Sequence, residues 1–420
     1  MKRIDVFEHG RLLIDNDTFT RDHWLSFVKL NHLHDEKYFH VRHDGLQFKQ
    51  FVGVIQVDGL MVHIHPKADK ADHDEKWHGV LLEMLKACGK LRPDSSDDAK
   101  LKKQHINLLE IYFSYYLSEL QDLIHKGLVK KYRKQTSQVK ALKGKLDFAG
   151  NIQRNAIHKE RFYTNHQIYD VNHKFHQVLK YALSIVGQFS RGTLINDLYR
   201  RIDLAFPEVD HIVPNESFLD TLKIDRDRKI VSYNRALELA KFIILNYSPD
   251  INLGNKRMIA LLFDMNELWE EYVLKMLKKY CREHPAEGWQ VTGQESRIFY
   301  GAYRTIRPDI VLRRAEEVFI LDTKWKRPPN KAASIEDLRQ MYAYARFWKT
   351  NKVMLLYPGE PYDSGYKTYP NHHDHETDHH QCKIAMVNVL KDGTLSDSLA
   401  EDILGLLGEK EPFQKNVSNL

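Results

Sequence analysis

The sequence predicts an α/β fold, mixed α+β overall, on the basis of three observations. Short β-branched runs bounded by turn residues mark strands near the N-terminus and again after residue 288. Segments with apolar residues at three- and four-residue steps mark long helices between these strands. Near residue 315 a hairpin is followed by alternating helix and strand patterns, which predicts a mixed sheet flanked by helices. We therefore divide the chain into a strand-rich domain at 1–104, a helical and mixed domain at 105–255, and an α/β domain at 256–420.

The composition is ordinary for a globular protein, with 42% hydrophobic and 29% charged residues among 420. The net charge of +6 permits a polyanionic partner. Three isolated cysteines, Cys88, Cys281 and Cys382, suggest neither a disulfide framework nor a cysteine-based zinc site. The N-terminal residues lack the apolar core of a signal peptide, and no apolar run approaches the roughly 20 residues of a membrane span. We expect a cytoplasmic protein that has no membrane partner.

The clearest element of the first domain is a hairpin at 48–65, where two β-branched runs flank the turn dipeptide Asp58-Gly59. A polar stretch with Pro and Ser at 90–104 predicts a linker to the next domain. The other expected elements are a strand or hairpin at 4–14 and helices at 18–33 and 77–89.

Two groups of histidines raise the question of a metal site. His63 and His65 alternate onto one face of the second strand of the 48–65 hairpin. With no third ligand in view, solvent-facing histidines are the preferred interpretation. Five more histidines lie between His372 and His380. Histidine-rich tracts bind transition metals, but the flanking turn residues favour an exposed loop, and we leave its role open.

The middle domain begins with a long helical pattern at 105–135 and contains further helical patterns at 172–186 and 231–246. From 126 to 161, eleven Lys or Arg stand against two acids. Such a run can neutralise phosphates or form a solvated face, and we weigh these interpretations equally. Seven residues are the candidates for binding a nucleic acid or a partner: Lys130, Lys131, Arg133, Lys134, Lys140, Lys143 and Lys145.

The segment 307–326 of the third domain carries the most specific chemical pattern. It predicts a strand at 310–312, a charged turn at 313–317 and a second strand at 318–325. Because side chains on a strand alternate, Asp322 and Lys324 share a face and Thr323 lies opposite. Asp309 heads the first strand, where the hairpin brings it close to Asp322.

Two carboxylates with an amine at the end of a sheet suit a hydrolytic metal site. Mg²⁺ prefers oxygen ligands and keeps several waters, so two carboxylates plus phosphate and water suffice. A metal held there lowers the pKa of a bound water and stabilises charge on a phosphate. Lys324 could orient that water or offset phosphate charge. An Asp-x-Lys sequence alone is common, and an ordinary strand with an exposed acid and base is the competing interpretation.

Two helices flank this hairpin in the sequence. An amphipathic helix is expected at 256–282, with Glu270 at the border of its apolar face. A second helix is expected at 334–349, where Gln340 and Tyr344 share a face at i, i+4 spacing. Further strands are expected at 289–300, 352–357 and 383–389.

The order of strand, Pro-Asp, hairpin, Asp-Thr-Lys and a helix with Gln-x-x-x-Tyr resembles the PD-(D/E)xK nuclease superfamily. Asp309, Asp322 and Lys324 match its motif, and Gln340 and Tyr344 match the extra motif of its RecB-like members. Three other segments resemble the McrC family: FDMNELWEEYV at 263–273, VGVIQVDGLMVHIHPKAD at 52–69, and ALKGKLDF at 141–148 with YDVNHKFHQVLKYAL at 169–183. The resemblance therefore touches all three domains.

The resemblance implies a DNA endonuclease subunit of an McrBC-type restriction system, with an N-terminal part that docks on and stimulates a ring of AAA+ GTPase subunits. The partner would recognise and translocate DNA, and this chain would be oligomeric through that complex. The cofactor would be Mg²⁺, with Mn²⁺ as the alternative. Asp309, Asp322 and the Thr323 backbone carbonyl would hold it. Lys324, Glu270, Gln340 and Tyr344 would complete the site, although Glu267 and Glu271 compete with Glu270 for its role.

Two other functions stay open. One is a nuclease of the same superfamily that acts alone in DNA repair, without a GTPase. The other is a non-catalytic nucleic-acid-binding scaffold that uses the basic run. The scaffold would be favoured if Asp309, Asp322 and Lys324 did not meet in space.

Overall fold

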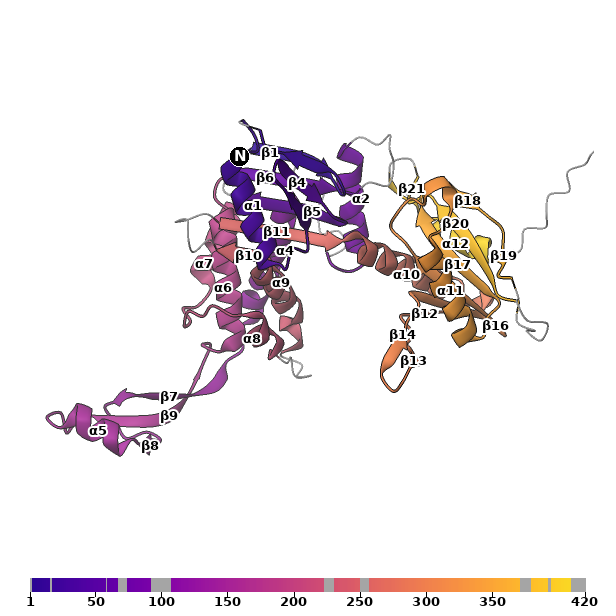
Figure 1. The fold of residues 1–420 in the computed structure, drawn as a ribbon. Helices are drawn as coiled ribbons and strands as arrows, with labels where there is room; N and C mark the ends of the chain where they lie inside the picture. Colours follow the sequence, from indigo (N-terminus) through magenta and orange to yellow (C-terminus); the bar gives the residue numbers. More distant parts are fainter. Residues whose placement is uncertain are drawn as a thin grey trace, which may run out of the picture. The chain divides into compact units, whose positions relative to one another are not determined.

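The computed structural model describes residues 2–15, 17–57, 59–66, 74–91, 107–222, 230–249, 257–370, 379–391 and 394–408 (Figure 1). The chain forms two compact units. Unit 1 comprises 1–100 and 262–420, and unit 2 comprises 101–261. The breaks fall near the expected boundaries at 104 and 255. However, the first and third of the expected domains belong to one compact unit.

The N-terminal part of unit 1 contains a hairpin and a parallel neighbour strand, which are β5 (Phe51–Val57), β6 (Leu60–His65) and β1 (Lys2–Phe7). Strands β5 and β6 pair antiparallel on either side of 58–59, which confirms the expected hairpin. Strand β1 pairs parallel with β6. A second antiparallel sheet consists of β2 (Arg11–Leu13), β4 (Gly45–Phe48) and β3 (Phe39–Arg42). The segment 4–14 is therefore two strands with different partners. Helices α1 (Arg21–Leu33) and α2 (Asp74–Ala87) complete this part.

The expectation that His63 and His65 face solvent is wrong. Their exposed fractions are 2% and 3%, because every residue of β6 is buried. His65 Nε2 lies 2.8 Å from Asp5 Oδ1 on the neighbouring β1, and His63 Nε2 lies 2.9 Å from Met61 Sδ. Alternation would expose one face of a sheet that is covered on one side only, but both faces of β6 are covered.

Unit 2 is built mainly of helices, which are α4 (Leu108–Lys126), α6 (Lys174–Phe189), α7 (Asn196–Ala205), α8 (Glu216–Asp220), η1 (Val231–Tyr233) and α9 (Asn234–Leu245). Strand β10 (Tyr247–Pro249) follows them, and strand β11 (Arg257–Asp264) begins in unit 2 and ends in unit 1. Helix α4 ends at Gly127, whose φ is +86°, so the expected helix at 105–135 is wrong beyond Lys126. No described helix combines the length and the apolar character that crossing a lipid bilayer requires.

A three-stranded antiparallel sheet projects from the helices of unit 2 (Figure 1). It consists of β7 (Lys131–Val139), β9 (Phe162–Asp170) and β8 (Lys145–Leu146), with helix α5 (Phe148–Asn155) at its outer end. We call residues 131–170 the arm. Much of the basic run lies on this arm rather than on a helix.

The C-terminal part of unit 1 is a seven-stranded sheet in the order β12-β15-β16-β17-β20-β18, with β19 also paired to β20. Pairs β16–β17 and β17–β20 are parallel and the others are antiparallel. The strands are β12 (Trp289–Gly293), β15 (Ile310–Arg314), β16 (Glu317–Thr323), β17 (Lys352–Pro358), β18 (Tyr362–Asp363), β19 (Lys367–Thr368) and β20 (Gln381–Val387).

Helices pack against this sheet. They are α10 (Met265–Glu283), α11 (Ile335–Trp348) and α12 (Leu399–Leu407). Helix α11 begins after Ser334, whose side chain accepts a hydrogen bond from the Asp337 amide, as capping residues do. Its Met341 and Ala345 pack into one buried cluster with Val311 and Ile320 of the hairpin. Short elements complete the part: η2 (Pro285–Glu287), β13 (Arg297–Tyr300), β14 (Arg304–Ile306), η3 (Pro329–Lys331), β21 (Leu390–Lys391) and β22 (Thr394–Leu395).

Three expected elements need correction. Residues 257–264 form β11, and the helix begins only at Met265, after the Asp264 cap. An uninterrupted apolar run fits a buried strand as well as a helix, so periodicity alone could not separate them. The expected strand at 289–300 is two strands, β12 and β13, and among the described strands β13 pairs only with β14. In the hairpin, β15 continues to Arg314, so the turn is shorter than expected.

Candidate active site

The β15–β16 hairpin places Asp309 next to Asp322. Ile310 pairs with Leu321, so the residues one step beyond them lie at the same end of the two strands. Asp309 Oδ2 accepts hydrogen bonds from the Thr323 backbone amide at 2.7 Å and from Thr323 Oγ1 at 2.9 Å. This contact holds the start of β15 against the end of β16.

Asp322 is 1% exposed. Its Oδ2 lies 2.8 Å from Lys324 Nζ, but neither carboxylate oxygen accepts a well-aligned hydrogen bond from the described residues. Burial, and then the nearby Asp309 carboxylate, raise its pKa to about 7, while Lys324 opposes the rise. A buried carboxylate with free oxygen lone pairs is costly, so this position is suited to receiving a cation.

Burial and neighbouring charges also shift the pKa values of Asp309 and Lys324. Burial raises the pKa of Asp309, against the lowering effect of its hydrogen bonds from Thr323. Burial lowers the pKa of Lys324, but the nearby carboxylates of Asp322, Asp309 and Asp337 together outweigh burial, and the net shift is upward. Lys324 is therefore a cation held beside the two acids.

A chain of hydrogen bonds links Lys324 to helix α11. Its Nζ donates to Gln340 Oε1 at 3.3 Å, and Gln340 Nε2 donates to Tyr344 Oη at 2.8 Å. Tyr344 Oη in turn donates to the Arg307 carbonyl at 2.9 Å. Burial raises the pKa of Tyr344 to about 12, so it is the neutral donor. The Gln-x-x-x-Tyr pair thus lies beside the predicted site and ties Lys324 to the backbone that leads into Asp309.

Glu270 of α10 also faces this region. Gln294 Nε2 donates to Glu270 Oε1 at 2.6 Å, and the backbone amide of Gln294 donates to the backbone carbonyl of Asp309 at 2.9 Å. Burial, and then the charge of Asp309, raise the pKa of Glu270. Of the competing acids, Glu271 pairs with Lys90 at 3.0 Å, and Glu267 is exposed. The geometry therefore favours Glu270 among the three.

Gln294 was not identified from the sequence. It follows β12 with φ of +53°, a conformation that is uncommon outside Gly. It bridges Glu270 and Asp309, which belong to different elements. No sequence pattern marks it, because its role depends on the pairing of β12 with β15.

The seven basic candidates lie apart from these acids in the sequence, and two of them have partners of their own. Arg133 forms a bidentate ion pair with Asp170, with Nη2 at 3.0 Å from Oδ2. Lys131 Nζ lies 4.1 Å from the centre of the Phe175 ring. The other five are exposed: Lys130, Lys134, Lys140, Lys143 and Lys145.

The histidine-rich stretch is described only in part. Residues 371–378 lie outside the described residues, and so do three of its five histidines. His380 is buried, and its Nδ1 lies 3.0 Å from the Thr350 carbonyl. Within the described ranges, no group of three or more His, Cys, Asp or Glu is placed to hold a metal ion.

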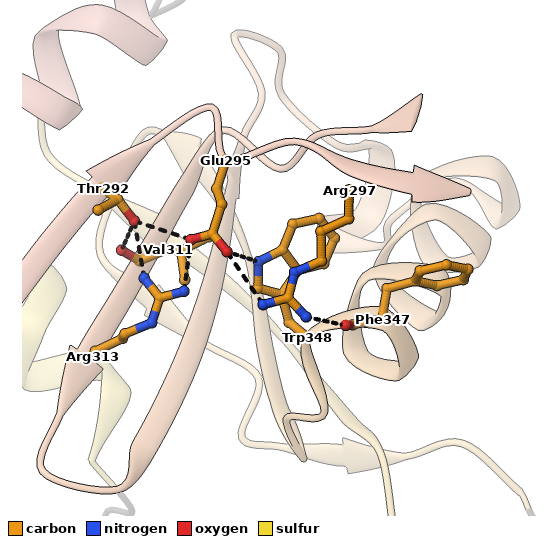
Figure 2. A network of polar contacts seen from close by, with 7 residues as sticks. All are labelled: Thr292, Glu295, Arg297, Val311, Arg313, Phe347 and Trp348. Carbon is orange, nitrogen blue, oxygen red and sulfur yellow. Dashed lines mark hydrogen bonds and ion pairs between the residues drawn. The ribbon is translucent and has the colours of Figure 1, made fainter. Parts of the chain in front are cut away.

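A second polar cluster lies beside the site, between β12, β15 and α11 (Figure 2). Glu295 Oε2 accepts from Arg313 Nη2 at 2.6 Å. Its Oε1 accepts from Trp348 Nε1 at 3.0 Å and from Arg297 Nη2 at 3.3 Å. These contacts lower the pKa of Glu295 against the effect of burial. The cluster joins three elements of the domain through one carboxylate.

Comparisons with known proteins agree with this architecture. A family model described as McrBC 5-methylcytosine restriction system component matches residues 46–358. The Type IV methyl-directed restriction enzyme EcoKMcrBC of Escherichia coli (strain K12) is 24% identical over 233 residues. This match covers 52% of the present chain and 64% of that enzyme, which is less than two thirds of its length.

Two solved structures share the fold. One is a refined half-complex from a tetradecameric assembly of Thermococcus gammatolerans McrB AAA+ hexamers with bound McrC. It matches with a TM-score of 0.67 at 17% identity and covers 97% of this chain and 99% of that one. The other is the cryo-EM structure of the Thermococcus gammatolerans McrBC complex, with a TM-score of 0.50 at 18% identity over 66% of this chain and 88% of that one. The matches confirm the expected mixed α/β fold.

Proposed function

Because the chain belongs to the McrBC 5-methylcytosine restriction system component family, we propose that it is the DNA endonuclease subunit of such a system, hydrolysing phosphodiester bonds with the help of a divalent cation. One observation carries the proposal. The hairpin brings Asp309, Asp322 and Lys324 together at one end of a buried sheet. A scaffold would have no reason to keep an ionisable, poorly hydrogen-bonded carboxylate such as Asp322 in its interior. Perturbed acids gathered in this way are typical of functional sites.

The residues fit Mg²⁺, with Mn²⁺ as the alternative. Asp309 and Asp322 offer carboxylate oxygens, which Mg²⁺ prefers, and two carboxylates with water and phosphate are a usual ligand set. The Thr323 carbonyl is a further candidate ligand, while the Thr323 amide and hydroxyl hold Asp309 in place. When bound, the cation would activate a water and offset phosphate charge. Glu270 would accept a hydrogen bond from that water.

Lys324 would act directly on the reacting groups. Its Nζ lies between Asp322 and Gln340 and can donate to an attacking water or to a phosphate oxygen. A positioned cation stabilises developing charge only while its geometry is kept. Gln340 and Tyr344 would be positioning residues that keep Lys324 in place. They act through hydrogen bonds to Lys324 and to the backbone before Asp309.

The partner of this chain would be a ring of AAA+ GTPase subunits that recognises and translocates DNA. In the Thermococcus gammatolerans assembly McrC is bound to McrB AAA+ hexamers, and the shared fold supports the same arrangement here. The arm of unit 2 is a suitable contact surface, because it exposes both cations and large apolar side chains, including Phe148, Ile152 and Ile157. The nuclease would then cut when the assembly holds it against DNA.

The test is a cleavage assay of the full chain on methylated and unmethylated plasmid. The assay is run with and without a candidate AAA+ GTPase encoded by a neighbouring gene, and in buffer with Mg²⁺ or with EDTA. We expect cleavage that requires Mg²⁺, GTP and the GTPase. Asp322→Asn should lose cleavage yet stimulate GTP hydrolysis like the parent. Glu336→Gln, an exposed acid on α11, is the matched control and should cleave normally.

Two results would contradict the proposal. Full cleavage by Asp322→Asn with normal circular dichroism would remove the catalytic assignment. Cleavage that needs no GTPase would favour the stand-alone nuclease.

A further inference from the structure

The hairpin of β13 and β14, residues 297–306, stands apart from the main sheet. The two strands pair with each other and extend beyond the sheet of their own domain (Figure 1). Four large apolar side chains close together in the sequence are exposed on it: Ile298, Phe299, Tyr300 and Tyr303. Tyr300 and Tyr303 are 75% and 83% exposed. Clustered exposed aromatics on a small element mark an interaction surface rather than a folding requirement.

The base of the hairpin is held firmly. Arg297 lies over the Trp348 ring at 4.7 Å, donates to the Phe347 carbonyl and contacts Glu295 (Figure 2). The ring of Phe299 lies 5.3 Å from that of Phe347. These contacts attach the hairpin to helix α11, the helix that carries Gln340 and Tyr344. The element is therefore oriented with respect to the acids.

The charged side chains of the hairpin and the residue that follows it are all positive. Residues 297–307, RIFYGAYRTIR, contain three arginines and no acid. Glu295 satisfies Arg297. Arg304 is exposed, pairs across the strands with Tyr300, and makes no side-chain hydrogen bond or ion pair with the described residues. An aromatic ring beside an uncommitted guanidinium is a combination that suits a polyanion carrying flat bases.

The hairpin also leads directly into the site. Strand β14 ends at Ile306, which packs against the buried cluster under α11. Arg307 and Pro308 then connect it to Asp309. The Arg307 carbonyl accepts from Tyr344, and its guanidinium acts electrostatically on both Asp309 and Glu270. The base of the hairpin therefore lies beside the two carboxylates.

We propose that the 297–306 hairpin binds the DNA beside the scissile phosphate, with Tyr300 and Tyr303 against sugars and bases and Arg304 on the backbone. The inference rests on the proposed nuclease function and names an element that positions its substrate. A protein surface would need acidic groups opposite Arg304. DNA supplies negative charge and stacked rings together.

The experiment measures binding of a short fluorescent DNA duplex by the full chain at low salt, in an Asp322→Asn parent that does not cleave. The test variant adds Tyr300→Ser, Tyr303→Ser and Arg304→Gln. Removing aromatic contacts and one phosphate contact should weaken binding by about tenfold or more. The control variant adds Leu204→Ser and Arg201→Gln, which are equally exposed positions in unit 2, and should bind as the parent does.

Association with the GTPase ring is measured in parallel. Weaker DNA binding with unchanged ring association supports the proposal. Unchanged DNA binding overturns it, and if ring association is lost instead, the hairpin is a protein-docking element. A parent that binds no duplex at low salt also overturns it. Absence of cleavage by the wild-type complex would instead contradict the proposed nuclease function. The binding assay does not depend on cleavage, so it tests the role of the hairpin separately.

Discussion

Trp325 Nε1 donates a 2.7 Å hydrogen bond to Glu8 Oε1, across 317 positions of the sequence. Both side chains are buried, and Trp325 directly follows Lys324. The Trp325 ring also lies 5.6 Å from that of Trp269 on α10. The N-terminal part of unit 1 therefore contacts the strand end that carries the candidate catalytic lysine. This contact is one reason why residues 1–100 and 262–420 form a single compact unit.

Trp325→Phe should destabilise unit 1. The change keeps the six-membered ring but removes the donor, and the loss of a buried hydrogen bond to a carboxylate costs about 1–3 kcal/mol. We expect the free energy of unfolding in urea, followed by circular dichroism, to fall by that amount. Trp289→Phe is the control, because the Trp289 indole nitrogen donates to none of the described residues. Equal effects of the two substitutions would show that the hydrogen bond to Glu8 contributes nothing.

Asp322 should make stability depend on pH in metal-free buffer. Its pKa is raised from 3.8 to about 7, so between these values the folded chain binds a proton that the unfolded chain does not. Stability from this group is present below about pH 4 and is lost as the pH rises towards 7. The Asp322→Asn variant has no carboxyl group to ionise at this position, so it does not lose this stability as the pH rises. The difference in Tm, variant minus wild type, should therefore grow from pH 4 to pH 7. A difference that stays flat, or that shrinks, would contradict the assigned burial of the charge.

Tyr344→Phe should slow DNA cleavage without abolishing it. The hydroxyl accepts from Gln340 and donates to the Arg307 carbonyl, so its loss loosens the position of Lys324. Small displacements of a catalytic group cost up to about a hundredfold, and we expect a tenfold or greater fall in the single-turnover rate. Tyr342→Phe on the same helix is the control, since that ring packs against Tyr369 and His380. The hypothesis fails if both variants cleave at the wild-type rate.

Charge removal on the arm should weaken association with a polyanion or an acidic partner surface. The structure separates the candidates, because Lys134, Lys140 and Lys143 of the arm are among the five exposed lysines, while Lys131 and Arg133 have partners within unit 2. Changing these three arm lysines to Gln should weaken binding to the GTPase ring or to DNA. The effect should shrink as salt rises, because exposed charges are screened.

Titration of binding at low and high salt checks this prediction. The control replaces Lys278 and Lys279 of α10, which belong to unit 1, by Gln. If binding of both DNA and the ring is unchanged at low salt, the exposed lysines form only a solvated face.

Local chemistry made parts of this fold predictable. The hairpin around Asp58-Gly59, the β15–β16 hairpin and helix α11 after Ser334 each carry their own signal within about fifteen residues. The closeness of Asp309 to Asp322 was also expected from the sequence, because a hairpin brings its two ends together, whereas the register depended on a shorter turn than expected. For the same reason Gln340 and Tyr344, one helical turn apart, could be assigned to a shared face.

Only the tertiary structure decided the remaining features, because they depend on contacts between distant segments. Periodicity could not show that residues 257–264 are a buried strand. Alternation could not show that His63 is buried, since that depends on what packs against each face of the sheet that contains β6. Gln294 joins Glu270 to Asp309, and Glu8 reaches Trp325, only after sheets and helices have packed. A sequence pattern predicts which residues share a face of a helix or strand. Which segment packs against that face is determined by the free energy of packing the whole unit.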